Sequence, residues 1–322
     1  MIGLEKNDRQ KVFDRFVSGK SSQERIRRVL AISKWLFTPI AFLFLVFALW
    51  QSRLAIKETL EQSQAQFLAL SICFWMVGHL ISPWFACVAL TTSGAKIRYY
   101  EALDLHLRYL PARYLPGGIW HTVARVGGLR SLGIHPSHLS SFVVLENVLA
   151  AGVTLLAGGI LVGIGVPTGH MQQIAFLCAT GSLVILLVSP IGVNRLILRA
   201  TGKLRYTNYM AAMAIVGVFW GIASASFLSF AIALPSAFAI NEWWRVVGAY
   251  LFSWGVGFLA IFAPQGVGVF EAVAANTLAS QLSFEAAVVL VAGFRLVVLL
   301  ADVGMWGGWL ILVAFRRKRA TF

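Results

Sequence analysis

The strongest candidates for chemistry in this sequence are polar side chains that follow two breaks in its hydrophobic pattern. The first break, in segment 111–125, reads PARYLPGGIWHTVAR, and the second, in segment 262–272, reads FAPQGVGVFEA. His121 and Arg125 follow the first break, and Glu271 follows the second. If the chain resumes a helix after the first break, His121 and Arg125 share a face. The guanidinium of Arg125 would offer a phosphate a fork of donors, which predicts a site for an anionic headgroup. The alternative is that Arg125 is a topology charge at the end of a loop.

Both breaks consist of proline and glycine. Proline removes a backbone donor, and glycine permits conformations that other residues resist. Such breaks are tolerated in a membrane where the freed backbone lines a protein cavity, and paired breaks in the two halves point to a binding site near the midplane. The resumed helices would also present N-terminal amides to an anion. The break residues predicted to shape a substrate path are Pro116, Gly117, Gly118, Trp120, Pro264, Gly266 and Gly268.

Four ionisable residues lie within or beside apolar stretches, where charges are expensive and therefore mark function by default. They are Glu146, Glu271, Arg295 and Asp302. Arg295 and Asp302 are seven residues apart and share a helical face. We predict that these side chains line or gate the path. The alternative is a structural ion pair, such as Glu146 or Asp302 with Arg295, that only fixes helix packing.

Composition predicts a membrane protein. The chain has 322 residues, of which 58% are hydrophobic and 12% charged, whereas about 25% of the residues of a soluble domain are charged. We predict an all-α fold, a polytopic helical integral membrane protein with about 7–8 transmembrane helices. The expected parts are a basic N-terminal arm at 1–34, a single transmembrane domain at 35–315 and a basic tail at 316–322.

The apolar stretches predict the order of the spans. Segment 102–125 is expected to be re-entrant from the cytoplasmic side, and segment 264–282 to be a short broken crossing. The last stretch, 284–315, is long for one span, so it either tilts, starts outside the hydrocarbon core or holds two passes. The full spans are predicted at 35–50, 66–90, 139–165, 171–190, 210–234 and 243–263.

Charge predicts the orientation. The formal net charge is +14, and nine Lys and Arg residues lie in the arm, six in loop 91–130, four in loop 191–209 and four in the tail. Because cytoplasmic loops are rich in Lys and Arg, both termini are predicted to be cytoplasmic in a multi-pass protein of the cytoplasmic (inner) membrane. The arm and tail are also suited to an anionic lipid surface. Loop charges of this kind do not favour a nucleic-acid partner.

The sequence carries none of the familiar enzyme motifs. It contains no P-loop, no G-x-S-x-G, no HExxH and no DxD. Its three cysteines lack metal-ligand spacing and are expected to be small buried residues. No cofactor and no metal site are therefore predicted. Glycines at 152, 158, 159 and 163, and again at 304, 307 and 308, predict close helix packing and allow a homodimer.

At the two breaks the sequence resembles the transmembrane, flippase-like domain of the lysylphosphatidylglycerol synthases and their stand-alone relatives. The pattern of that family is a Pro-Gly segment leading to Arg, then Pro-x-Gly-x-Gly followed by Glu. This chain matches it at Pro116 to Arg125 and at Pro264 to Glu271, and an acidic residue in the third span, Glu146, also fits. It departs from the pattern at Ala150, where the family usually has aspartate, and at Gln265, where glycine is common. The resemblance covers roughly residues 30–315.

The resemblance implies re-entrant helices around a lipid-sized cavity. In the synthases this domain is thought to move an aminoacylated lipid between leaflets. Since the chain shows no soluble aminoacyl-transferase domain, we do not expect it to make that lipid. The Trp120-His121 variant resembles stand-alone members linked to surface polysaccharide assembly.

Three functions follow as hypotheses. The first is a translocator of a phospholipid or lipid-linked saccharide. The second is a non-catalytic membrane partner in envelope lipid or polysaccharide assembly. The third is a membrane-embedded transferase with Glu146, Glu271 or His121 as general base.

Overall fold

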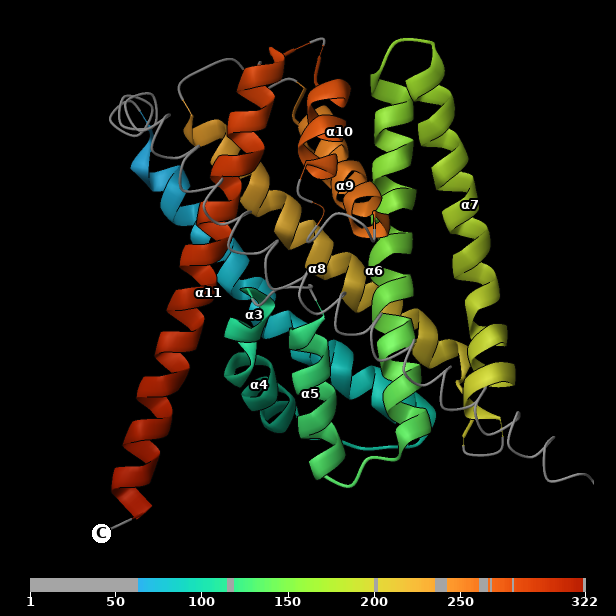
Figure 1. Ribbon diagram of the computed structural model, residues 1–322, viewed down its shortest axis with the longest axis vertical. Coiled ribbons are helices and arrows are strands. Elements are labelled where there is room, and N and C mark those ends of the chain that lie inside the picture. The colour runs from blue at the N-terminus through green and yellow to red at the C-terminus, as the bar shows by residue number, and fades with distance from the viewer. Residues whose placement is uncertain are drawn as a thin grey trace, which may run out of the picture. The chain divides into compact units, whose positions relative to one another are not determined.

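The computed structural model describes residues 63–114, 119–199, 202–234, 242–260, 266, 268–279 and 281–320. All of them belong to one compact unit. Over these ranges the chain is helical and contains no strand, which confirms the all-α class (Figure 1). The predicted arm and first span, together with Pro116, Gly117, Gly118 and Pro264, lie outside the described residues.

Within the described residues, five helices are long and apolar enough to cross a membrane. Each exceeds the ~20 residues that the hydrocarbon core requires. The chain is therefore a multi-pass membrane protein. The five are α3 (Ala65–Ser93), α6 (Pro136–Gly165), α7 (His170–Gly192, continued by the π-helical turn η2, Val193–Leu198), α8 (Tyr206–Ala233) and α11 (Phe284–Ala320).

Helices α3 and α8 pack antiparallel along their length. The backbone N–H of Gln64 donates to the carbonyl of Ala233, and seven residues further along α3 the hydroxyls of Ser71 and Ser226 each donate to the other's carbonyl at 2.7 Å. These buried serines satisfy donors that lipid could not, which holds the register of the pair.

Helix α6 uses its glycines to approach two neighbours. A Cβ on Gly158 would lie 2.4 Å from the backbone nitrogen of Phe252 in α9 (Trp243–Leu259), and one on Gly159 would lie 2.6 Å from the carbonyl oxygen of Ala175 in α7. The packing predicted for this glycine group is thus confirmed. Among the described residues, a Cβ on Gly307 or Gly308 would meet nothing within 4 Å, so the second predicted group shows no close packing there. The cysteine prediction was also wrong for Cys73, which is exposed, and Cys87 and Cys178 are only partly buried.

Replacing Gly158 with alanine is expected to destabilise the protein by about 1–3 kcal/mol, because backbone cannot yield to the added methyl group. Gly181 in α7 is the matched control, since a Cβ there meets nothing within 4 Å. Alanine at that position should stabilise the helix by up to about 1 kcal/mol. Unfolding of both variants in mixed micelles measures the difference. Equal effects at the two sites would contradict the close contact of α6 and α9.

A first helical hairpin contains the first break. It consists of α4 (Tyr99–Arg108), the 3₁₀ turn η1 (Leu110–Tyr114) and α5 (Trp120–Ser131). The two arms touch where a Cβ on Gly128 would lie 2.5 Å from the side chain of Leu105. Neither arm is long enough to span a bilayer, since twelve residues of helix rise only about 18 Å. A re-entrant segment was predicted here.

A second hairpin, formed by α9 and α10 (Val269–Thr277), contains the second break. Gly257 near the end of α9 packs on Gly266, and Gln281 beyond α10 donates to Glu242 just before α9. The chain therefore turns back on itself and returns to the level at which α9 began. Gly266 has φ +68° and its absent Cβ would lie 3.0 Å from the backbone of Gly257, so only glycine suits this turn.

This hairpin corrects the expectation of a short crossing at 264–282. Helix α10 has nine residues and rises about 14 Å, less than half the ~30 Å of the hydrocarbon core. The segment is the returning arm of a hairpin and not an independent crossing. The last apolar stretch does not hold two passes, because α11 is one continuous helix.

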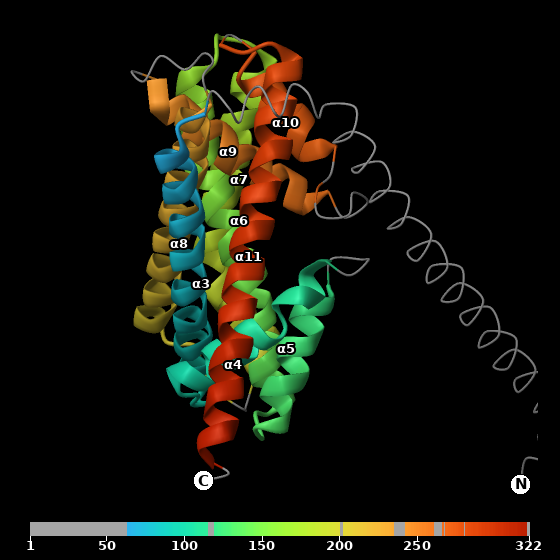
Figure 2. The same ribbon diagram turned by 90° about the vertical axis from the view of Figure 1, so that its left-hand side faces the viewer.

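The two hairpins approach α11 from opposite ends (Figures 1 and 2). Arg295 in the first half of α11 binds Glu271 of α10, whereas Trp309, nearer the C-terminus, donates to Asp104 of α4. Between them, Asp302 binds η1. The η1 turn therefore meets the middle of α11, and the first turn of α10 meets α11 two turns nearer its start.

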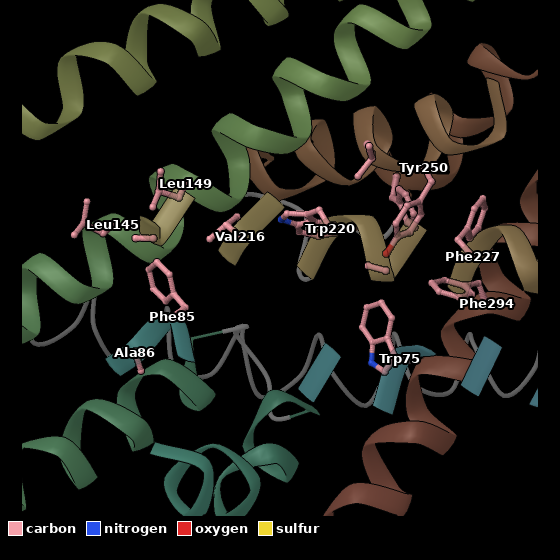
Figure 3. Packing of buried hydrophobic residues seen from close by; sticks show 14 of the residues in the cluster. Trp75, Phe85, Ala86, Leu145, Leu149, Val216, Trp220, Phe227, Tyr250 and Phe294 are labelled. Carbon is pink, nitrogen blue, oxygen red and sulfur yellow. The ribbon is translucent and has the colours of Figure 1, made fainter. Parts of the chain in front are cut away.

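A buried apolar cluster joins these elements. Trp75 of α3, Trp220 of α8, Tyr250 of α9 and Phe294 of α11 all belong to it (Figure 3). Tyr250 and Phe294 meet edge to face with ring centroids 5.6 Å apart. Aromatic contacts of this kind add about 0.5–1.5 kcal/mol each beyond burial, so the core holds the second hairpin against α11.

The arrangement predicts which loops share a side of the membrane. In a cysteine-free background, Ser283→Cys and Gly169→Cys should react with an impermeant thiol reagent from one side, and Ser131→Cys from the other. Ser283 lies at the base of the second hairpin and Ser131 ends the first, and all three positions are exposed. Labelling in oriented vesicles measures this. Reaction of Ser283→Cys and Ser131→Cys from the same side would contradict the opposed hairpins.

Candidate functional site

One face of α11 organises the polar interior. Arg295, Asp302 and Trp309 are spaced by seven residues, so they lie on one face at intervals of about 10.5 Å. Each binds a residue of a hairpin. The sequence predicted the shared face of Arg295 and Asp302, but not the partners.

The carboxylate of Asp302 is the centre of this site. Its side chain is 2% exposed. Oδ1 accepts from Trp75 Nε1 at 3.1 Å and lies 2.7 Å from His79 Nε2. Oδ2 accepts from Arg113 Nη1 at 3.1 Å and from the Tyr114 hydroxyl at 2.8 Å. Burial and the nearby carboxylate raise the pKa of Tyr114, which keeps its hydroxyl protonated as a donor.

Asp302 therefore ties three elements together. Trp75 and His79 come from α3, and Arg113 and Tyr114 come from η1, the turn that precedes the first break. A buried charge is retained only where it is paired and hydrogen-bonded. The interactions of this one carboxylate hold η1 on α3 and α11.

Histidines extend the site away from Asp302. His79 Nδ1 lies 3.0 Å from His106 Nε2, and the ring of His106 lies 5.5 Å, centroid to centroid, from that of His121. Burial is the main cause that lowers the pKa of both His106 and His121, and neighbouring cationic groups add to it, so both rings are neutral at pH 7. Within the described structure, His106 Nδ1 and His121 Nε2 are buried without a hydrogen-bond partner.

Arg125 and Glu146 form a second buried pair. Arg125 Nη2 donates to Glu146 Oε1 at 2.6 Å, and the guanidinium also lies over the ring of Phe142. The side chain of Arg125 is 7% exposed and that of Glu146 is 26% exposed. The pair joins the returning arm of the first hairpin to α6. Glu146 therefore already occupies Nη2 of this guanidinium.

Glu271 and Arg295 form a third pair beside the second break. Arg295 Nη2 lies 2.8 Å from Glu271 Oε1, and the backbone N–H of Gly268 donates to Glu271 Oε2 at 2.7 Å. Glu271 thus caps its own helix. The N-terminal amides that the sequence offered to an anion are partly used by this carboxylate.

The structure therefore pairs the predicted charges differently from the structural alternative drawn from the sequence. Arg295 binds Glu271, and neither Glu146 nor Asp302 pairs with it. His121 and Arg125 do follow the break on one helix, and both turn inward. Trp120, which begins that helix, is exposed, as is Gly268, whereas Gly266 is buried.

Sequence reasoning missed five residues of the site. They are Trp75, His79, His106, Arg113 and Tyr114. Arg113 was counted among the loop charges. His79 could have been recognised as a site candidate, because it is a polar residue inside an apolar span. His106 lies in a mixed polar segment that gives no such contrast. Among the described residues, no group of three His, Cys, Asp or Glu side chains is placed to hold a metal ion.

A scan of protein-family models finds no match to the chain, and neither does a search of curated proteins. The resemblance to the synthase domain therefore rests on the two break segments and their setting.

Proposed function

We propose that the protein moves a phospholipid or a lipid-linked saccharide between the leaflets of the cytoplasmic membrane. The observation that carries the proposal is the pair of hairpins whose tips approach the middle of α11 from opposite ends. Broken helices at membrane depth are tolerated where they are buried in protein or line a polar path. Opposed hairpins of this kind suit a headgroup that crosses while its tails stay in lipid.

The charges between the hairpins support an anionic headgroup. Arg113, Arg125 and Arg295 each lie at or beside a hairpin tip and each pairs with a carboxylate. Arg113 has 39% of its side chain exposed, the most of the three. A phosphate could compete for such guanidinium groups, since they recognise it with paired donors. Arg113, which the sequence did not single out, is thus proposed as the first contact.

The order of the crossings supports the proposed orientation. The α9–α10 hairpin begins and ends at one level, so it leaves the parity of crossings unchanged. The five candidate spans together with the predicted span at 35–50 then make an even number, which suits two cytoplasmic termini. Helix α5 and the C-terminal end of α11 lie at the same end of the unit (Figure 2). We assign that end, which carries the basic segments, to the cytoplasm. The resemblance to the flippase-like synthase domain fits this assignment.

Leaflet exchange in proteoliposomes tests the proposal. The full chain should accelerate exchange of fluorescent phosphatidylglycerol over protein-free vesicles, and should act less on zwitterionic phosphatidylcholine, because the path is lined by arginine. If neither lipid moves faster, the same assay with a polyprenyl-linked sugar tests whether the protein moves a lipid-linked saccharide instead. Failure of all three substrates would contradict translocation and favour a non-catalytic role in envelope assembly.

A further inference from the structure

The hydrogen bonds of the His79–His106 pair indicate which ring nitrogen carries each proton. Asp302 Oδ1 faces His79 Nε2 at 2.7 Å, and the other three neighbours of this carboxylate are donors. A carboxylate paired with Arg113 stays ionised and accepts, so Nε2 of His79 carries the proton. In the form of the site that has not yet taken up a proton both rings are neutral, and a neutral imidazole has one donor and one acceptor nitrogen, which leaves Nδ1 of His79 as the acceptor.

The same reasoning fixes His106. His79 Nδ1 accepts, so the nitrogen 3.0 Å from it, His106 Nε2, donates. Nδ1 of neutral His106 is then an acceptor, and this atom is buried without a partner in the described structure. The residue is only 6% exposed. A buried acceptor without a partner is costly, and such an exception points to a ligand that the site is built to take.

We propose that His79 and His106 form a binding site for one proton, and that this proton is coupled to movement of the substrate. The proton site stands on geometry alone, whereas the coupling rests on the proposed function. Nothing in the sequence motifs or the resemblance assigns this role.

The transfer balances along the pair. An arriving proton forms a bond with Nδ1 of His106, and the bond between Nε2 and its hydrogen breaks as that proton passes to Nδ1 of His79. His106 ends neutral with its proton on Nδ1. His79 ends as an imidazolium with Nε2 still donating to Asp302. The lowered pKa of His106 fits this order, because burial disfavours a resting charge on that ring.

The charged groups around the two rings favour His79 as the final position of the added proton. His106 faces His79 from α3, His121 and Arg125 from α5 and Arg113 from η1. These neighbours are neutral or cationic, so positive charge on His106 is disfavoured. His79 instead faces the carboxylate of Asp302 on α11, and Trp75 donates to the same oxygen. An imidazolium there is the favoured charged state.

Binding of the proton would loosen the first hairpin. Asp302 holds Arg113 through Oδ2 and His79 through Oδ1. A positive charge on His79 partly neutralises the carboxylate and weakens its attraction for Arg113. Arg113 lies two residues before the undescribed segment that contains the first break. Proton uptake and the hold of α11 on η1 are thereby linked through one carboxylate.

Histidine NMR of the full chain in nanodiscs tests the proton site. The chain has six histidines, so ¹⁵N signals can be assigned with His79→Gln and His106→Gln. At about pH 8, both rings should carry their proton on Nε2. When the site takes up its proton on acidification, His79 should become doubly protonated while the His106 proton moves to Nδ1. A change of tautomer in His106 together with protonation of His79 is the result that the proposed transfer predicts.

A control variant and two contrary results complete the test of the proton site. His170→Gln, at an exposed position that begins α7, should remove one signal and leave the titration unchanged. Titration of His79 should lose its link to His106 in His106→Gln. If the wild-type rings keep their tautomers over the whole range, or titrate independently, the proton site is wrong. If His79→Gln or His106→Gln fails to fold, His135→Gln and His170→Gln assign the exposed rings, and the buried rings are followed among the remaining wild-type signals.

Coupling between proton movement and leaflet exchange is measured in a separate experiment. Vesicles that contain a pH-sensitive dye should report proton movement together with leaflet exchange, and His106→Gln should lose the dye signal. Exchange that is indifferent to an imposed pH gradient would overturn coupling while leaving translocation intact. Absence of exchange would overturn the proposed function, and the NMR titration would still decide the proton site.

Discussion

Replacing Asp302 with asparagine is expected to lower the free energy of unfolding by about 3–5 kcal/mol, the usual cost of removing one partner of a buried ion pair. The carboxylate is 2% exposed and binds Arg113, His79, Trp75 and Tyr114. An amide is uncharged and has one acceptor oxygen, so one of the two pairs of donors would face an NH₂ group and Arg113 would lose its charged partner. Reversible unfolding in mixed micelles measures the loss.

Asp104 provides the matched control for this substitution. It lies in α4, in the hairpin that Asp302 anchors, and binds Arg108 and Trp309, but its side chain is 36% exposed. Asp104→Asn should cost less than about 1 kcal/mol, because exposed ion pairs contribute little. Equal costs at Asp104 and Asp302 would show that Asp302 does not anchor the hairpin.

Removing Glu146 should be more harmful than removing Arg125. Glu146→Gln leaves the guanidinium of Arg125, with a side chain 7% exposed, beside a neutral amide, at a cost of about 3–5 kcal/mol. Arg125→Gln leaves a carboxylate that is 26% exposed and better able to reach water, so the loss should be smaller. The two single variants and the double variant, compared by unfolding, measure the pair directly.

Arg98→Gln is the control for this cycle, since its pair with Glu101 lies at the surface with 71% of the arginine side chain exposed. Its effect should stay below about 1 kcal/mol. If Arg125→Gln proves costlier than Glu146→Gln, the guanidinium is not the buried member on which the site depends.

The sequence predicts the long helices well because their signal is local. An apolar run of about 20 residues has few alternatives to a spanning helix, and α6, α7 and α8 lie close to the predicted spans 139–165, 171–190 and 210–234. Segment 243–282 was harder, because an apolar run does not say whether the chain continues across the membrane or returns. The return depends on the contact of Gly257 with Gly266.

The site was predictable in part for the same reason. Residues such as Glu271 and Arg295 stand out because each is a charge in an apolar setting, and that contrast is visible in one segment at a time. Their pairing is a property of tertiary structure, and a single sequence does not contain it. His106 had no contrast with its neighbours, and its place beside His79 emerges only when α4 packs on α3.

Leaflet exchange by hairpin variants is the decisive test of whether a headgroup passes between the two hairpin tips. Wild-type protein should accelerate exchange of a fluorescent phospholipid, Arg125→Ala and Glu271→Gln should each abolish the acceleration, and Asp104→Asn should retain it. A path between the tips would be contradicted if both variants, shown to be folded, exchanged lipid as fast as the wild type.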